Sequence, residues 1–321
     1  MKIAILDDYQ DNVRRLPCFA LLDGHDVKIF NNRAVGLGQL AIRLASFEVL
    51  VLNQERTTLS RALLQKLPRL KLIAQTGRAG EHIDLAAAAE LGIAVVDGAG
   101  DPTAPAELTW ALIMASSRKI TQYSSNLRDG LWQMSSLNPE HNRLGRALKQ
   151  RTLGIWGYGR IGKLVAGYGR AFGMRVMVWG SEASRVQAQQ DGYHAAISRV
   201  AFFSEADILT LHLRLTDATH SIVSAADLAA MKSDAVLVNT SRAELVQPGA
   251  LEAALLQGHP GFAALDVFES EPLPVQHPLL KMENVLATPH LGYVEQDSYE
   301  LYYRAAFQAV LDFAGAIPSS A

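Results

Sequence analysis

The chain has 321 residues, a formal net charge of -2, 49% hydrophobic residues and 19% charged residues. This composition excludes a disordered or fibrous protein, and the near-neutral charge gives no electrostatic reason to expect nucleic acid or an anionic membrane as a partner. The length is sufficient for two domains, each with its own core.

The sequence also predicts where the protein works. A single cysteine, Cys18, excludes an internal disulfide and a site of several thiolates. No apolar run reaches the roughly 18 residues that a membrane helix requires, and the first apolar run, residues 3–6, is too short for a secretion signal. We therefore expect a soluble, cytoplasmic protein without a metal site.

Short apolar runs alternate with helical patterns in the first third of the chain, which is typical of βα units on a parallel sheet. Helices are expected in the stretches LSRALLQKLP and IDLAAAAELG, the second ending at Gly92 because glycine commonly ends a helix. The strands expected here are residues 3–6, 27–30, 49–52, 70–75 and 93–96.

The pattern changes between residues 101 and 150. The stretch PTAPAELTWALIMASSRKI predicts one long helix with proline near its start, followed by an extended polar arm that contains Trp132. An extended arm has little to pack against within its own subunit, so we expect it to join two copies of the chain in a homodimer.

A second βα series begins at Thr152 and ends in a helix over residues 296–313. The two series predict an α/β fold of two Rossmann-like or flavodoxin-like domains, each a doubly wound parallel sheet, with a cleft between them. The expected first domain is discontinuous, residues 1–98 plus 293–321. The expected second domain is residues 99–292, including the arm at 101–150. The strands expected in the second series are residues 153–156, 176–179, 208–213, 235–239, 262–267 and 285–287.

The stretch GIWGYGRIG, residues 154–162, follows an expected strand and opens an expected helix. In that context G-x-G-x-x-G predicts dinucleotide binding: Gly157 allows the tight turn, Gly159 lets the backbone approach a pyrophosphate, and Gly162 lets helix and strand pack closely. The same letters nearly fit a triphosphate-binding loop. Leu164 stands where Ser or Thr must hold Mg²⁺, however, which argues against that loop.

The acidic residue that usually follows the next strand of such a fold is absent. A dinucleotide site normally places Asp or Glu there to bind the adenosine ribose hydroxyls, but this chain has Gly180. In one interpretation Glu182 reaches the ribose and keeps a preference for NAD. In a second, Ser181 and Arg185 admit the 2′-phosphate of NADP. In a third, Glu182 and Arg185 are solvated surface charges.

Three polar side chains follow expected strands of the second series: Arg242, Glu271 and His290. In parallel α/β sheets, ligands bind beyond the carboxyl ends of the strands. Hydride transfer to a 2-oxo acid needs a cation for the carboxylate, a proton donor at the forming alkoxide, and a carboxylate that stabilises the protonated donor. The set predicts this chemistry, although each residue alone is also compatible with a structural role as an interface ion pair, a loop acid or a cap.

These motifs resemble those of the D-isomer-specific 2-hydroxyacid dehydrogenase family over nearly the whole chain. The likeness rests on the stretches TLGIWGYGRIGKLVA, EADILTLHLRLTDATHSIV, MKSDAVLVNTSRAELVQPGAL, AALDVFESEPLP and NVLATPHLGY. It implies an oxidoreductase that transfers a hydride between NAD or NADP and a 2-oxo acid or D-2-hydroxy acid, with Arg242, Glu271 and His290 as catalytic residues. The length implies a short form without a C-terminal regulatory domain, similar to glyoxylate or hydroxypyruvate reductases or to a short phosphoglycerate dehydrogenase.

The resemblance also implies that residues 1–98 plus 293–321 form the substrate-binding domain and that residues 99–292 form the NAD(P)-binding Rossmann domain, including a dimerisation arm at 101–150. It further implies which residues bind the two ligands. Arg56 and the loop of Arg78, Ala79 and Gly80 would bind the substrate, although Arg78 departs from the family's usual Gly-Val-Gly. Asp266 would lie at the nicotinamide end of the cofactor. The residues implied to line the cofactor site are Gly157, Gly159, Arg160, Ile161, Gly162, Gly180, Ser181, Glu182, His212, Thr240, Asp266, Gly292 and Tyr293.

A non-enzymatic alternative stays open at this point. The C-terminal binding protein corepressors share the scaffold and the three catalytic residues, yet act largely as dinucleotide-responsive interaction proteins, and a fold does not fix a function. The sequence also leaves open which 2-oxo acid is the substrate, which direction the reaction takes, and whether the cofactor is NAD or NADP.

Overall fold

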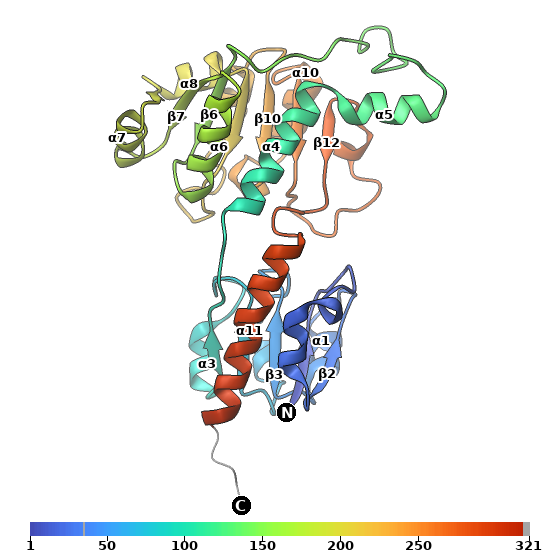
Figure 1. The fold of residues 1–321 in the computed structure, drawn as a ribbon, viewed down its shortest axis with the longest axis vertical. Helices are drawn as coiled ribbons and strands as arrows, with labels where there is room; N and C mark the ends of the chain where they lie inside the picture. The colour runs from blue at the N-terminus through green and yellow to red at the C-terminus, as the bar shows by residue number, and fades with distance from the viewer. Residues whose placement is uncertain (35, 317–321) are drawn as a thin grey trace, which may run out of the picture. The chain divides into compact units, whose positions relative to one another are not determined.

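The computed structural model describes residues 1–34 and 36–316, which form two compact units (Figure 1). The first unit comprises Met1–Asp101 and the segment that begins at Glu295, and the second comprises Pro102–Val294. Residues 317–321, assigned to the first domain from the sequence, lie outside the described residues. The expected α/β fold of two parallel sheets is confirmed.

The first unit is built on a five-stranded parallel sheet with the order β2-β1-β3-β4-β5. This is the flavodoxin-like order, in which ligands bind beyond the carboxyl ends of the strands. Strands β3 and β4 are buried throughout, which explains why their residues are apolar apart from Gln75 at the end of β4. The strands are β1 (Lys2–Ile5), β2 (Asp26–Ile29), β3 (Val49–Leu52), β4 (Leu72–Gln75) and β5 (Ala94–Val96).

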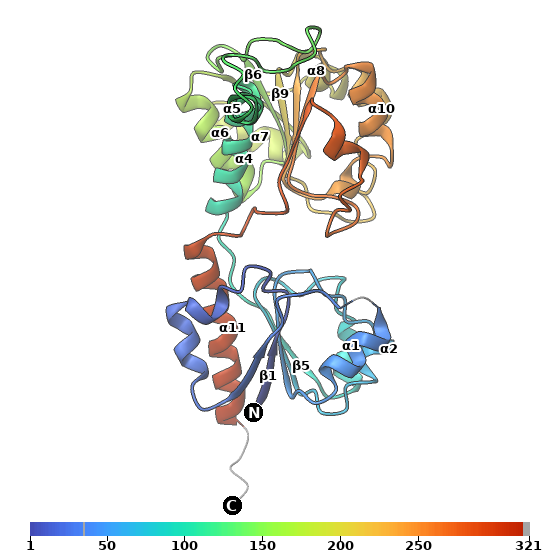
Figure 2. The same ribbon diagram turned by 90° about the vertical axis from the view of Figure 1, so that its right-hand side faces the viewer.

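Helices cover both faces of this sheet (Figure 2). One face carries the last helix of the chain, α11 (Gln296–Ala316), with the 3-10 helices η1 (Val13–Arg15) and η2 (Pro17–Leu22). Phe307 of α11 is fully buried and meets the ring of Phe19 edge-on at 6.3 Å. The other face carries α1 (Leu37–Leu44), α2 (Arg61–Leu64) and α3 (Leu85–Glu90). Helix α2 forms only one turn of the longer helix expected over LSRALLQKLP.

The second unit is built on a seven-stranded parallel sheet with the order β12-β11-β10-β9-β6-β7-β8. The two-residue strand β8 was not expected, because it is too short to produce a sequence pattern. The strands are β6 (Thr152–Trp156), β7 (Arg175–Trp179), β8 (His194–Ala195), β9 (Ile208–Leu211), β10 (Val236–Asn239), β11 (Phe262–Leu265) and β12 (Val285–Ala287).

This sheet is also covered on both faces, and each face has its own apolar core. The helices on one face are α4 (Thr103–Ser117), α6 (Arg160–Ala171) and α7 (Glu182–Gln190). Those on the other are α8 (Arg199–Glu205), α9 (Ala225–Ala229) and α10 (Ala250–Gln257). The connections also contain the 3-10 helices η3 (Ala243–Leu245) and η4 (Pro278–Lys281).

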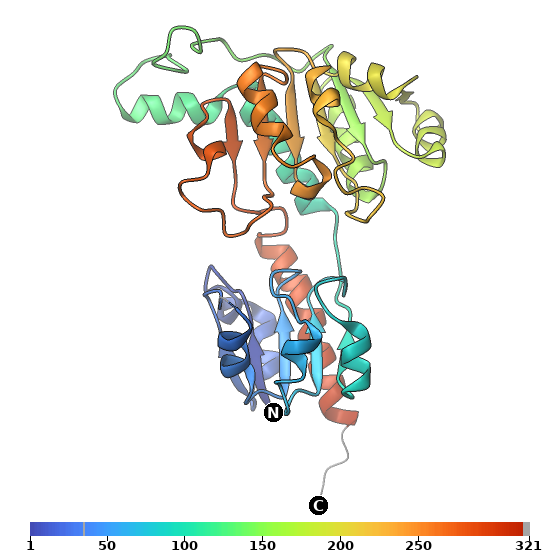
Figure 3. The same ribbon diagram turned by 180° about the vertical axis from the view of Figure 1, so that it is seen from behind.

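The long helix expected over residues 102–120 is present as α4 but ends at Ser117. A separate helix that the sequence did not predict, α5 (Ile120–Arg128), follows it. Lys119 lies between them with φ 52°, a left-handed conformation that interrupts helical hydrogen bonding. Helix α5 and the segment after it extend away from the sheet of the second unit (Figures 1 and 3).

Among the described residues, no helix combines the length and the apolar character needed to cross a membrane.

Candidate active site

The seven-stranded sheet reverses its winding between β6 and β9, because β7 and β8 lie on one side of β6 and the remaining strands on the other. The crevice beyond the carboxyl ends at such a point is where α/β sheets bind ligands. Gly157 follows β6 with φ 100°, and a Cβ atom there would lie 2.5 Å from the carbonyl oxygen of His212, which follows β9. Only glycine fits this close crossing.

The other two glycines of the motif have different surroundings. A Cβ atom on Gly162 would collide with the carbonyl oxygen of Gly157, so helix α6 starts directly against the turn. A Cβ atom on Gly159 would meet nothing within 4 Å. Arg160 and Ile161 form the first turn of this twelve-residue helix. A bare backbone beside a helix N-terminus fits the pyrophosphate of a dinucleotide.

His212 lies beside the glycine turn, but its side chain is not suited to proton transfer. Its Nε2 atom lies 3.1 Å from Oγ1 of Thr210. Part of the residue is accessible to solvent, yet the surrounding protein desolvates the imidazole and lowers its pKa to about 4. The ring is therefore neutral near pH 7 and offers the site a hydrogen-bonding surface.

The residues after β7 lie beside the glycine turn. The Gly157 N–H donates to the carbonyl oxygen of Trp179, the last residue of β7, at 3.1 Å. Gly180 follows with φ 155°, and Ser181 then caps helix α7 by accepting a hydrogen bond from the Ser184 N–H at 3.3 Å. Glu182, the first residue of α7, is exposed.

Glu271 and His290 are in direct contact. His290 Nδ1 lies 2.7 Å from Glu271 Oε2, and each side chain is 25% exposed. The second carboxylate oxygen, Oε1, accepts a hydrogen bond from the Phe268 N–H at 3.0 Å. The carboxylate is therefore held by its own loop and aimed at the imidazole, which fixes Nδ1 as the paired nitrogen and leaves Nε2 as the one for proton transfer.

Arg242 lies in the turn after β10, the strand next to β11. The turn is organised by Asn239, whose side chain donates to the Arg242 carbonyl oxygen at 2.9 Å and accepts from the Ser241 N–H at 3.0 Å. The guanidinium donates to the Ser241 carbonyl oxygen at 2.8 Å. Sequence reasoning missed Asn239, although a polar residue at the end of the apolar run VLVN was a usable signal.

Asp266 fixes the segment that carries His290. Its buried carboxylate accepts hydrogen bonds from Thr288 Oγ1 at 2.6 Å, from the Leu291 N–H at 2.7 Å and from the Gly292 N–H at 2.9 Å. Burial raises the pKa of Asp266, while these bonds and the charge of His290 act in the opposite direction. Thr288 was not predicted, and His290 itself adopts a left-handed φ of 54°.

Two further residues expected at the cofactor have clear partners. The hydroxyl of Thr240 lies 2.7 Å from the hydroxyl of Thr109 on α4. The ring of Tyr293 meets the imidazole of His290 edge-on, with 5.9 Å between centroids and 72° between planes. The imidazole of His290 is therefore contacted by the ring of Tyr293 as well as by Glu271.

In the first unit, the expected substrate residues follow β3 and β4. The Arg56 guanidinium lies 5.3 Å from the centroid of the Tyr9 ring, and Arg78 is exposed. The Ala79 N–H donates to Asp97 Oδ1 at 2.7 Å. We expected this N–H, with those of Arg78 and Gly80, to hold a substrate carboxylate. It is available for that only when Asp97 releases it.

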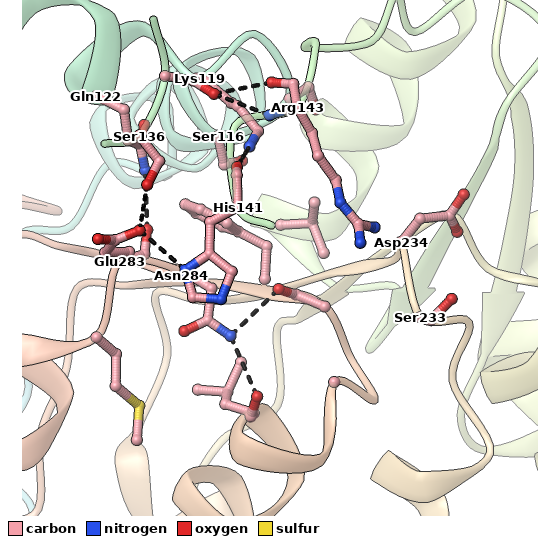
Figure 4. Close-up of a pocket in the computed structure, with 18 of the residues that line it drawn as sticks. Ser116, Lys119, Gln122, Ser136, His141, Arg143, Ser233, Asp234, Glu283 and Asn284 are labelled. Atoms are coloured by element: carbon pink, nitrogen blue, oxygen red, sulfur yellow. Dashed lines mark hydrogen bonds and ion pairs between the residues drawn. The ribbon is translucent and has the colours of Figure 1, made fainter. Parts of the chain in front are cut away.

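A cavity of about 760 Å³ lies at the opposite edge of the seven-stranded sheet, between the strand starts and the arm (Figure 4). Glu283, just before β12, accepts a hydrogen bond from Ser136 at 2.7 Å and contacts His141 Nδ1 at 3.0 Å. These contacts tie the arm to the body of the unit, and the cavity is separate from the candidate active site.

A nucleotide-binding turn and a histidine–glutamate pair on one edge of a parallel sheet define a nicotinamide-dependent oxidoreductase. Residues 110–292 match the family described as "D-isomer specific 2-hydroxyacid dehydrogenase, NAD binding domain". The chain belongs to the D-isomer-specific 2-hydroxyacid dehydrogenase family. It is an NAD(P)-dependent enzyme that interconverts 2-hydroxy acids and 2-oxo acids.

Its relatives act on several small acids. The chain is 38% identical to a glyoxylate reductase of Aeropyrum pernix over 80% of this chain and 77% of that protein. It is 33% identical to a hydroxypyruvate reductase of Thermotoga maritima over 76% of this chain and 78% of that protein. A solved structure of a phosphoglycerate oxidoreductase from Vibrio cholerae is 52% identical, with a TM-score of 0.95 and coverage of 99% of this chain and 100% of that one.

Proposed function

We propose that this enzyme reduces a small 2-oxo acid with His290 as the proton donor, Glu271 as the group that orients it, and Arg242 as the cation for the substrate. The observation that carries the proposal is the 2.7 Å contact between His290 Nδ1 and Glu271 Oε2. A carboxylate at that distance fixes the orientation of the imidazole and leaves Nε2 free to face the substrate oxygen.

The fit of the glycine turn to a dinucleotide supplies the other half of the reaction. Bound NAD(P)H provides the hydride that reaches the carbonyl carbon. As negative charge develops on the carbonyl oxygen, Nε2 of His290 donates its proton, and the guanidinium of Arg242 stabilises the charge and binds the carboxylate by a paired hydrogen bond. Asp266 keeps His290 in place through its bonds to Thr288 and the following backbone.

We assign substrate recognition in part to the first unit, through Arg56 and the loop of residues 78–80. The support is their place beyond the carboxyl ends of β3 and β4, the edge at which parallel sheets bind ligands. The exposed Arg78 adds a positive charge at this edge, which favours anionic substrates. We also assign cofactor binding to residues 99–292.

The test is a substrate panel. Glyoxylate, hydroxypyruvate, pyruvate, phosphohydroxypyruvate and bulkier 2-oxo acids are each supplied with NADH and with NADPH, and absorbance of the reduced cofactor is followed. We expect oxidation that depends on the oxo acid. Tight cofactor binding without any oxo-acid turnover would contradict the proposal and favour a corepressor-like binding protein.

We further infer that the arm joins two copies of the chain. Residues 120–144, the outer part of the arm, expose several large apolar side chains. Apolar side chains clustered on a protein surface commonly mark an interaction site. They are Ile120, Leu127, Trp132, Leu137 and Leu144, each more than half exposed. We propose that a second copy of the chain covers these side chains. The arm extends away from its own unit and so buries little apolar surface against that unit.

Light scattering on Leu137→Asp/Leu144→Asp tests the dimer. Wild-type protein should have twice the chain mass and the variant should shift to monomer. Ile197→Asp is the matched control, because Ile197 is 89% exposed but lies outside the arm. A monomeric wild type would contradict the dimer.

We also propose that the protein works in the cytoplasm. The buried free thiol of Cys18 is compatible with that reducing compartment.

A further inference from the structure

The segment after β7 differs from an ordinary NAD site in a way that points to a phosphate. The usual carboxylate for the ribose hydroxyls would follow this strand, and Gly180 occupies the position. A Cβ atom on Gly180 would lie 3.9 Å from the N atom of Gly157 and 3.4 Å from Cβ of Ser184. The absent side chain therefore leaves room directly beside the pyrophosphate turn.

Arg185 is held beside this space by an aromatic ring. Its Cζ atom lies 5.0 Å from the ring centroid of Trp179, the residue before Gly180. A guanidinium over an indole face is restrained in orientation while it keeps its charge and its donors. Its Nε–H is buried and finds no hydrogen-bond acceptor among the described residues. An incoming anion would satisfy a donor that the protein itself leaves unmatched.

Ser181 adds a hydroxyl at the same place. Its oxygen accepts from the Ser184 N–H at 3.3 Å and donates to Ser184 Oγ at 3.1 Å, so both hydroxyls lie at the start of α7. This helix has nine residues, and its N-terminal N–H groups add a partial positive charge. The one acidic residue in the first turn of α7 is the exposed Glu182.

We propose that Gly180, Ser181 and Arg185 form a subsite for the adenosine 2′-phosphate, so that this enzyme prefers NADPH to NADH. The proposal rests on the function proposed above, since it concerns the adenosine end of the same cofactor. The guanidinium and the helix N–H groups can only donate, which suits a phosphate, and the Ser181 hydroxyl can donate to it as well. The carboxylate that usually accepts from a free 2′-hydroxyl is missing after β7. Glu182 is then a solvated helix-start charge.

Calorimetric titration of the full chain tests the subsite without turnover. The probes are NADPH, NADH, adenosine 2′,5′-bisphosphate and 5′-AMP. We expect the 2′-phosphorylated member of each pair to bind ~10-fold or more tightly, the scale of one hydrogen bond to a charged group. Equal or tighter binding of NADH and 5′-AMP would overturn the proposal and leave the oxo-acid chemistry intact.

Two variants assign the effect to residues. Arg185→Ala should weaken NADPH ~10-fold or more and leave NADH within about twofold. Ser181→Asp keeps a capping oxygen for α7 and should repel the phosphate, so that NADH becomes the tighter ligand. Arg170→Ala is the matched control, because it removes a similar guanidinium–ring contact, with Tyr193 at 5.1 Å, from α6. Equal losses for both cofactors in Arg185→Ala would refute the subsite.

Glu182→Gln tests the competing interpretation, in which Glu182 binds the ribose hydroxyls of NADH. If Glu182 binds the ribose hydroxyls, the variant loses NADH affinity, and the proposal is wrong. The subsite predicts unchanged NADH affinity and equal or tighter NADPH binding, because a negative charge near the phosphate is removed. A wild-type protein that binds none of the four probes would instead refute the cofactor site itself, and with it the proposed function.

Discussion

His290 Nδ1 lies 2.7 Å from Glu271 Oε2, although 18 residues separate them in the chain and each follows a different strand of the sheet. The pair exists because β11 and β12 are adjacent and parallel, so their carboxyl ends meet at one edge. Glu271→Gln keeps the shape of the side chain and removes its charge. We expect turnover to fall about 10- to 100-fold, since the protonated imidazole loses its partner.

The loss in Glu271→Gln should appear in kcat, because Glu271 holds the imidazole of His290 rather than the substrate or the cofactor. The measurement is kcat for 2-oxo acid reduction at saturating substrate. Glu269→Gln, an exposed acid of the same loop, is the control. A kcat equal to that of the wild type would show that Glu271 does not act on the proton donor.

Asp266→Asn should loosen the segment that carries His290. The variant amide has one acceptor oxygen, whereas the carboxylate accepts three hydrogen bonds through two oxygens. At least one buried N–H is left unpaired, which costs about 1–3 kcal/mol of unfolding free energy. We expect a lower Tm and a lower kcat. An unchanged kcat would assign Asp266 to the fold alone.

Gly162→Ala and Gly167→Ala form a matched pair within helix α6. A Cβ atom on Gly162 would collide with the Gly157 carbonyl oxygen, whereas one on Gly167 would meet nothing within 4 Å. The first variant should unfold at lower denaturant and lose dinucleotide affinity. The second should gain about 0.5–1 kcal/mol of stability, because alanine is the better helix former. Equal effects of the two substitutions would contradict the tight turn.

Cys18 provides a pH-dependent prediction in the first unit. Burial, helped by Glu300, raises the pKa of its thiol to about 12. The folded protein thus retains a proton that the unfolded chain releases near pH 8.5, and this contribution to stability is lost as pH rises from about 8.5 toward 12. Cys18→Ala should reduce that alkaline loss of stability, measured by denaturant titration across pH. Native protein at pH ~8 should also resist thiol reagents that label the unfolded chain.

Much of the fold was predictable from periodicity. The apolar runs of β3 and β12 gave their bounds directly, and those of the other strands except β8 gave bounds within a few residues. The break at Lys119 was not predictable, since its left-handed conformation is marked by neither glycine nor proline in the stretch SSRKITQ. Spacing alone also cannot show that Ala79 donates to Asp97, because that contact joins two strand ends.

The candidate site was partly predictable for a similar reason. Strand-end position indicated Glu271 and His290, because parallel strands place their carboxyl ends together. It did not indicate Thr288 or Asn239, whose roles are to hold other site residues rather than to face a ligand. The stacking of Arg185 on Trp179 likewise depends on the path of the chain through Gly180 and not on any motif.

The most direct test of the central claim is the single-turnover rate of His290→Ala with saturating 2-oxo acid and its preferred reduced cofactor. Loss of the general acid predicts a rate lower by ~10²–10⁴-fold, with the dissociation constant of the cofactor unchanged, since the substitution removes only the proton donor. A rate near that of the wild type would contradict the claim that the imidazole paired with Glu271 protonates the substrate.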